Sequence, residues 1–358
     1  MKKVDTHLPA GWETSIPHLP LLAEARAWEP LRKWGLSEVW RVTLHSGRTC
    51  IAKRTHGSML KEYAIYRELL IPLGISRPRL LSGWQTETVS YFLLEDVGHT
   101  TLEQQPESRL FMLAARQLAR IRCSTTHQLQ EQHTTVPANY YTTADHFLQA
   151  LNYLQAHPAI TPEYHQILNT TAKWLPAQLT TLYSELPATL CHNDYHVKNL
   201  VLNTTSTTQP QLTTTTSFAQ NTSTTDNTTS TANTATMETK IITIDWAMAS
   251  ISPYHGDLYS LLRNAAARNV SCQEVLAAYE HELHLLAQQD PCAQHLLARP
   301  LKWQHAMGGI CILLTSIEWI LREAYKELPE STAWIPKMFA SMQKCTTQIV
   351  PKTHTTHT

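Results

Sequence analysis

The sequence of 358 residues has no excess of charge of either sign and lacks the motifs that identify several common classes of enzyme. Lys plus Arg and Asp plus Glu both number 29, so no net field favours binding to nucleic acid or to an anionic membrane. The absence of G-x-x-x-x-G-K-[ST] argues against a P-loop nucleotide site, and the absence of H-E-x-x-H argues against the zinc protease site that uses it. We therefore expect a small molecule as the partner.

Neither a disulfide framework nor a targeting segment is indicated. The seven cysteines are odd in number, widely spaced and free of C-x-x-C pairs, a pattern typical of reduced thiols in the cytoplasm. The charged N-terminus leads into Pro and Trp instead of an apolar stretch, so we expect no signal peptide. The longest apolar run, 306–317, ends at Glu318 and is too short to span a bilayer, which predicts a buried helix and no membrane partner.

The most informative stretch is 190–202, where an Asp and an Asn lie five positions apart in a polar turn between apolar residues. Asp194 and Asn199 belong to an H-x-D-x-x-x-x-N string that starts at His192, and a second piece at 240–246 ends a β-branched run with Asp245. Phosphoryl transfer needs one carboxylate to accept the proton of an attacking hydroxyl, and an amide oxygen plus a second carboxylate to hold Mg²⁺. Either piece alone is compatible with an ordinary turn, but the two in this order predict such a site.

A lysine upstream completes the pattern. Lys53 lies inside an apolar strand, where an ammonium group is costly unless it has a partner; the alternative is a side chain that extends to solvent from an edge strand. The following helical segment, 60–70, offers Glu62 and Glu68. We favour Glu62 because it lies nearer the start of the helix, and a Lys–Glu ion pair that fixes the lysine on nucleotide phosphates is a recurring part of kinase sites.

The first part of the chain is predicted to be mostly β. Strands are expected on both sides of a turn within 34–44 and at 48–54, 80–84 and 89–94, with a short helix at 21–28. A hairpin turn with a glycine and a small hydroxyl residue lets backbone N–H groups approach phosphate, although G-x-G-x-x-G is missing. The connector after 89–94 offers backbone groups at Leu94 and Asp96 to an adenine edge, or it is simply a domain linker.

From about residue 110 the periodicity is helical, so we expect two parts, 1–95 and 96–350, and a flexible tail at 351–358. Asp257 lies near the start of a predicted helix, where an N-cap role is a sufficient explanation, so we interpret it as structural support and not as a catalytic residue. The segment 203–239 holds 17 Thr in 37 residues and only two charges. It lacks the apolar periodicity of a packed element, which predicts a disordered insertion between two short strands that otherwise form a hairpin; a threonine-rich β ladder is the alternative.

With these motifs in this order, the chain resembles the aminoglycoside phosphotransferase and choline kinase-like family over about 34–262. The resemblance rests on Lys53, Glu62, the Glu95-Asp96 connector, His192-x-Asp194-x4-Asn199, Ile244-Asp245-Trp246 and the later Gly-Asp-Leu. It implies a two-lobed, protein-kinase-like fold of the α+β class. In that fold a small antiparallel N-terminal lobe and a mostly helical C-terminal lobe hold ATP between them.

The resemblance also implies roles for individual residues. Those that would act on phosphate or proton are Asp194 as catalytic base, Asn199 and Asp245 as Mg²⁺ ligands, Lys53 as phosphate-binding lysine, and Glu62 as its partner. Those with supporting roles are Ser37 in the nucleotide loop, Leu94 and Asp96 at the adenine-binding hinge, and His192 beneath the catalytic loop. Asn193 and Lys198 replace residues that are commonly glycine in the family.

The prediction is therefore an ATP- and Mg²⁺-dependent transfer of the γ-phosphoryl group to a hydroxyl of a small molecule. A kinase-like fold with a structural or binding role, as in spore-coat-associated relatives, is the alternative, because a fold does not fix a function. The helical segments after 110 are not conspicuously acidic, so an aminoglycoside is not the favoured acceptor. Choline, amino alcohols, sugars and homoserine-like hydroxyls remain open.

Overall fold

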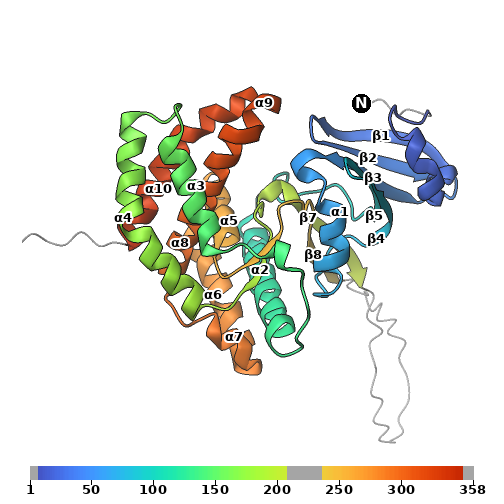
Figure 1. Ribbon diagram of the computed structural model, residues 1–358. Coiled ribbons are helices and arrows are strands. Elements are labelled where there is room, and N and C mark those ends of the chain that lie inside the picture. Colours follow the sequence, from blue (N-terminus) through green and yellow to red (C-terminus); the bar gives the residue numbers. More distant parts are fainter. Residues whose placement is uncertain (1–6, 208–235, 350–358) are drawn as a thin grey trace, which may run out of the picture.

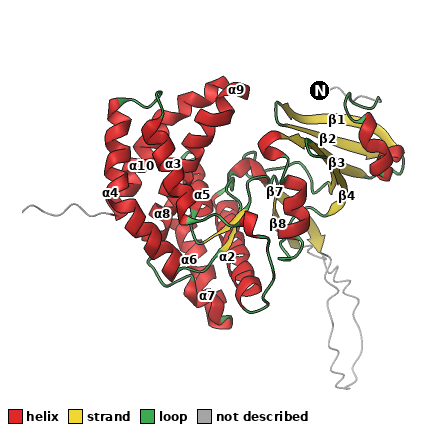
Figure 2. Cartoon of the chain, viewed as in Figure 1, coloured by secondary structure: helices red, strands yellow, loops and turns green. Residues whose placement is uncertain are grey.

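The computed structural model describes residues 7–207 and 236–349. A sheet-containing N-terminal lobe lies beside a larger, mostly helical C-terminal lobe (Figure 1). The predicted α+β, two-lobed, kinase-like fold is confirmed. Figure 2 shows the five-stranded sheet in the N-terminal lobe and most of the helices in the C-terminal lobe.

The N-terminal lobe is built on a five-stranded antiparallel sheet of order β1-β2-β3-β5-β4. Its strands are β1 (Ala25–Trp34), β2 (Ser37–Leu44), β3 (Thr49–His56), β4 (Leu80–Gln85) and β5 (Val89–Glu95). The helix predicted at 21–28 is wrong: a 3₁₀ segment, Pro20–Glu24, leads directly into β1. Trp28 is buried between the sheet and the N-terminal segment, so tertiary packing decides the conformation of this stretch.

Each face of this sheet is covered by a different segment. Trp12 and Leu19 of the N-terminal segment, which includes the 3₁₀ helix Glu13–His18, pack on one face. The other face receives a continuous helical segment, α1 (Glu62–Ile65) followed by a π-helical turn (Tyr66–Leu70). A buried cluster joins Tyr66 and Phe92 of this lobe to Trp246 of the C-terminal lobe. Apolar packing therefore runs across the junction of the lobes.

The C-terminal lobe packs its helices around two large apolar clusters. The longer helices are α2 (Ser108–Gln130), α3 (Ala144–Ala156), α4 (Pro162–Glu185), α5 (Gly256–Ala266), α6 (Cys272–Gln289), α8 (Leu301–Trp319) and α10 (Ile335–Ile349). Shorter helical pieces are Gly57–Met59, Ala138–Tyr140, Val197–Asn199, α7 (Pro291–His295), Ile320–Ala324, α9 (Tyr325–Glu327) and Pro329–Trp334. All seven cysteines are free thiols.

One helical stretch is apolar enough to resemble a membrane span. It runs from Leu301 to Glu327, through α8, the π-helical turn and α9, and is longer than the apolar run alone indicates. In the described part of the chain, 72% of its most apolar window is buried inside the protein. Packing within the C-terminal lobe accounts for its composition, as the sequence predicts for a buried helix.

Two short antiparallel strand pairs flank the motifs that contain Asp194, Asn199 and Asp245. β6 (Thr189–Cys191) pairs with β9 (Ser250–Ser252), and β7 (Leu200–Thr207) pairs with β8 (Thr236–Thr243). The prediction of a disordered insertion at 203–239 is wrong at its two ends. Residues 203–207 belong to β7 and residues 236–239 belong to β8. β-branched threonines are well suited to this pairing. The remainder, 208–235, and the predicted tail, 351–358, lie outside the described residues.

Candidate active site

Lys53, Glu62 and Asp245 form one ionic cluster at the junction of the lobes. The Lys53 Nζ lies 2.6 Å from a Glu62 carboxylate oxygen and 2.6 Å from Asp245 Oδ1, and both Lys53 and Glu62 are buried. Glu68, the other candidate partner, instead accepts a hydrogen bond from the Tyr140 hydroxyl at 2.9 Å. The cluster therefore joins β3 and α1 of one lobe to the strand end of the other.

The charges of Lys53 and Asp245 hold each other in the ionised state, whereas Glu62 responds mainly to burial. Burial disfavours the charged form of Lys53, but Asp245 and Glu62 outweigh it and raise the pKa of the lysine. Burial also opposes ionisation of Asp245, yet the Lys53 ammonium lowers the pKa of that carboxyl to about 2. For Glu62 burial is the larger effect and raises the pKa to about 7, against the influence of Lys53.

The loop that carries Asp194 is held by its own side chains. Asn199 Nδ2 donates to the Asp194 backbone carbonyl at 3.0 Å and to Asp194 Oδ2 at 2.9 Å. His196 Nε2 lies 3.3 Å from the other carboxylate oxygen, and the Asp194 side chain is 43% exposed. The five-residue spacing thus folds Asn199 back onto Asp194 and leaves the carboxylate accessible to a substrate.

His192 joins the two motifs. Its Nδ1 accepts the Asp194 N–H at 3.2 Å, so Nε2 carries the proton and donates to the Ile244 carbonyl at 3.0 Å. The ring also packs edge-on against Trp246, with centroids 4.5 Å apart. In addition, the Ile244 N–H donates to the Asn199 carbonyl at 2.9 Å. The loop with Asp194 and the strand end with Asp245 are therefore neighbours.

Asp257 also braces this loop. Its carboxylate accepts the N–H groups of His192 and Asn193 at 2.7 and 2.8 Å. The predicted N-cap role is wrong, since His255 occupies the N-cap position of α5 and Asp257 lies in the first helical turn. The helix thus presents Asp257 to the loop, and its role is support for the neighbours of Asp194.

Asn193 has a backbone conformation that favours glycine, with φ of +66°. Its side chain compensates by bonding to the 248–254 segment: Nδ2 donates to the Met248 carbonyl at 2.7 Å and to Ser250 Oγ at 3.0 Å. The Tyr254 hydroxyl donates to the Asn193 side-chain oxygen. An asparagine at this position of the motif therefore ties the loop to β9 in a way that glycine cannot.

The predicted nucleotide-loop residue Ser37 opens β2 and is buried. It follows the two-residue turn that begins at Gly35. The carboxylate of Glu327 from the other lobe lies next to this glycine. A Cβ atom at Gly35 would lie 1.6 Å from Glu327 Oε2, so a larger residue would displace this flexible side chain. The turn therefore meets the C-terminal lobe directly.

The two hinge residues lie where β5 leaves the sheet. Leu94 is buried between β3 and β4, opposite Ile51 and Leu80. The Asp96 carboxylate accepts from Arg41 Nε at 2.6 Å and from the Gly98 N–H at 3.1 Å. Because this side chain is engaged, a contact from Asp96 to an adenine edge would come from its backbone.

Arg32 of β1 is a site residue that sequence reasoning missed. Its Nη1 lies 3.3 Å from Asp245 Oδ2, and its guanidinium stands 5.1 Å from the ring centroid of Trp34. The side chain is 57% exposed, whereas that of Asp245 is 23% exposed. No local signal marks Arg32, since its partner is 213 positions away.

Comparison with known proteins identifies the family and the fold of the chain. Residues 28–213, more than half of the chain, match the model of the phosphotransferase enzyme family, APH. No curated protein gave a significant match. The two lobes and the site between them define a kinase-like protein. The chain belongs to the phosphotransferase enzyme family.

Solved structures with a similar fold include several kinases. The choline kinase of Cryptosporidium parvum Iowa II matches with a TM-score of 0.58 at 9% identity, over 92% of this chain and 90% of that one. APH(2″)-IIa in a streptomycin–ATP complex matches with 0.53 at 13% identity, over 97% and 100%. ADP-bound APH(2″)-Ib matches with 0.52 at 14% identity, over 94% and 99%. At these identities the similarity establishes the fold.

Proposed function

We propose that the protein transfers the γ-phosphoryl group of ATP to a hydroxyl of a small molecule in the cytoplasm. The observation that carries the proposal is the convergence of Lys53, Glu62 and Asp245 on one ionic cluster beside the loop of Asp194 and Asn199. Lys53 would hold the nucleotide phosphates, and Glu62 would keep its ammonium in place.

In the proposed reaction Asp194 accepts the proton of the acceptor hydroxyl. The new bond forms between that oxygen and the γ-phosphorus while the bond from phosphorus to the leaving oxygen of ADP breaks. Asn199 Nδ2, at 2.9 Å from Asp194 Oδ2, fixes the orientation of the carboxylate. The exposure of Asp194 gives the hydroxyl access to it.

Asn199 and Asp245 would hold Mg²⁺. Carboxylate and amide oxygens are ligands that Mg²⁺ prefers, and the lowered pKa of Asp245 keeps it ionised at neutral pH. The ion pairs of Asp245 with Lys53 and Arg32 support a role for this carboxylate in binding positive charge. Bound Mg²⁺ would neutralise negative charge on the phosphates.

Two measurements test this proposal. Thermal unfolding with and without Mg²⁺ and ATP should show a metal-dependent stabilisation, because a ligand that binds only the native state raises the melting temperature. ADP release in the presence of a library of hydroxyl compounds should then identify acceptors. A protein that responds to neither nucleotide nor metal would contradict the proposal and favour a structural role for the fold.

A further inference from the structure

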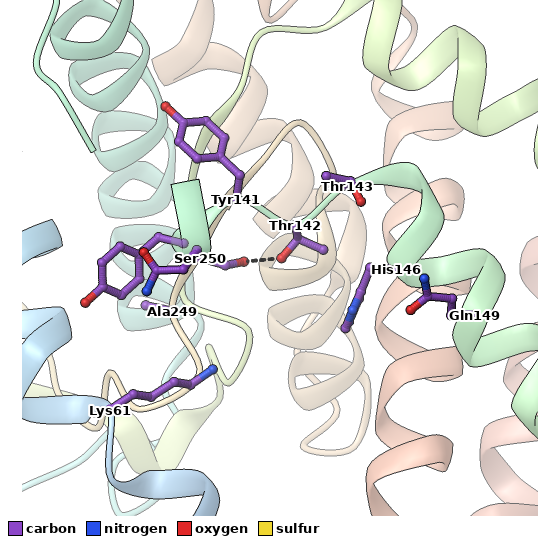
Figure 3. A pocket seen from close by; sticks show the side chains of 10 residues that line it. Lys61, Tyr141, Thr142, Thr143, His146, Gln149, Ala249 and Ser250 are labelled. Atoms are coloured by element: carbon purple, nitrogen blue, oxygen red, sulfur yellow. Dashed lines mark hydrogen bonds between the residues drawn. The ribbon is translucent and has the colours of Figure 1, made fainter. Parts of the chain in front are cut away.

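A cavity of about 360 Å³ lies between the lobes. Lys61 of the N-terminal lobe approaches it from one side, and the start of α3 and the β9 segment form the opposite wall (Figure 3). Its volume is at the lower end of the range of about 300–1,000 Å³ that is typical of small-molecule sites. The lining residues are Lys61, Asn139, Tyr140, Tyr141, Thr142, Thr143, His146, Gln149, Ala249 and Ser250.

Hydrogen bonds connect this cavity to the loop of Asp194. Ser250 Oγ accepts from Asn193 Nδ2 at 3.0 Å and from Thr142 Oγ1 at 2.9 Å, a bond drawn in Figure 3. Because Asn193 immediately precedes Asp194, the cavity wall is continuous with the loop that carries the proposed base. A hydroxyl compound in this cavity would lie beside that loop.

The lining contains no Asp or Glu. In the part of the chain that the structure describes, no carboxylate lies within 4.0 Å of the Lys61 ammonium. Lys61 is exposed to solvent, and the protein atoms near its ammonium group lower its pKa while Glu323 acts in the opposite direction. Lys61 thus brings to the cavity a positive charge without a close partner.

Two further features favour negative charge. Thr143 occupies the N-cap position of α3 and makes no side-chain capping hydrogen bond, so the positive end of this helix borders the cavity, and Asp145 in its first turn offsets only part of that charge. The ring of His146 supplies another polar group (Figure 3). Burial and the Lys61 charge lower the pKa of His146 against the influence of Glu318, a carboxylate that is paired with Arg322 at 2.8 Å.

We infer that this cavity binds the hydroxyl acceptor and selects a compact molecule with an anionic group, a carboxylate or a phosphate ester, that pairs with Lys61. The inference rests on the proposed phosphoryl transfer and adds its substrate class. An organic cation would meet the Lys61 ammonium without a lining carboxylate to offset the repulsion. Neutral polyols would fill the cavity but leave the lysine unpaired.

The test compares acceptors matched in size. Polyols, the corresponding aldonic acids, polyol phosphates and amino alcohols are assayed for ADP release with the full chain. The anionic compounds should give the highest kcat/KM. Whether the aldonic acids or the polyol phosphates are better then identifies the preferred group as a carboxylate or a phosphate. If amino alcohols are preferred, or if MgATP binds but neither anionic arm is turned over, the inference is wrong while the proposed function stands.

Substitutions of Lys61 sharpen the test. Lys61→Met should raise KM for the best anionic acceptor about tenfold or more, the range for loss of a charged hydrogen bond, and leave KM for ATP unchanged. Lys61→Arg should restore most of the affinity. Lys173→Met, at an exposed lysine of α4, is the control and should change neither constant.

An unchanged acceptor KM in Lys61→Met would overturn the inference. Calorimetric titration of the same compounds onto the nucleotide-free protein provides a second readout, in which Lys61→Met should weaken binding of the anionic compounds alone. Absence of MgATP stabilisation in the wild type would instead count against the proposed function and the inference together.

Discussion

Asp194 and Asp245 carry the same side chain in opposite surroundings. Asp245 is held between Lys53 and Arg32 at the junction of the lobes, and its pKa falls to about 2. Asp194 is more exposed, and its nearest partners are an amide and an imidazole. A carboxylate surrounded by cations suits the binding of positive charge, whereas one that an uncharged amide orients keeps a lone pair available for a proton. The surroundings therefore distinguish the two proposed roles.

The largest expected effect is on catalysis at Asp194. Asp194→Ala should lower turnover by about 100-fold or more, the usual contribution of a general base. Because the side chain is exposed, the melting temperature should change little. Steady-state kinetics with the best acceptor and thermal unfolding measure the two quantities. A variant as active as the wild type would show that Asp194 is not the catalytic base.

At Asp245 we expect a large effect on stability as well. A native pKa of about 2 against 3.8 in the unfolded chain corresponds to about 2 kcal/mol of stability at pH 7. Because the native pKa is the lower one, this contribution exists above about pH 4 and is lost as the pH falls toward 2. Asp245→Asn should therefore lower the free energy of unfolding at pH 7.

Urea unfolding of both proteins at pH 7, 3 and 2 measures this difference. It should shrink by about half at pH 3 and nearly vanish at pH 2. Asp194→Asn is the matched control at the exposed aspartate. An equal loss for Asp245→Asn at all three pH values would mean that lost packing, and not its charge, explains the destabilisation.

A smaller effect should follow from Arg32. Its ion pair with Asp245 is largely exposed, so Arg32→Ala should cost less than about 1 kcal/mol of stability. We expect the guanidinium beside Asp245 also to attract the nucleotide phosphates, so KM for MgATP should rise several-fold in this variant. Arg32→Lys should retain part of the affinity. Unchanged kinetics in Arg32→Ala would mean that Arg32 only pairs with Asp245 in the nucleotide-free protein and does not contribute to nucleotide binding.

The sequence predicts best what depends on local spacing. The separation of five positions from Asp194 to Asn199 sets their hydrogen bond, and the separation of nine from Lys53 to Glu62 brings a strand and the next helix together. Contacts across long separations carry no such signal, so Arg32 was not predicted and Asp257 was taken for a cap. The strand at Ala25–Trp34 was missed because burial of Trp28 against the N-terminal segment outweighs local preference.

The hairpin of β7 and β8 has a consequence for how this chain tolerates change in length. Two sets of backbone hydrogen bonds hold the base of this hairpin. The first is the β7–β8 ladder itself. The second joins β7 to the segment after β5, because the Leu202 N–H donates to the Thr100 carbonyl and the Leu102 N–H donates to the Leu200 carbonyl. At the far end Thr207 and Thr236 are register partners, so a short Asn-Gly turn joining them should replace 208–235. The shortened protein should keep the nucleotide affinity of the full chain, which calorimetry can measure. The segment beyond this ladder can therefore change in length while Asn199 and Asp245, the proposed metal ligands near its base, stay in place.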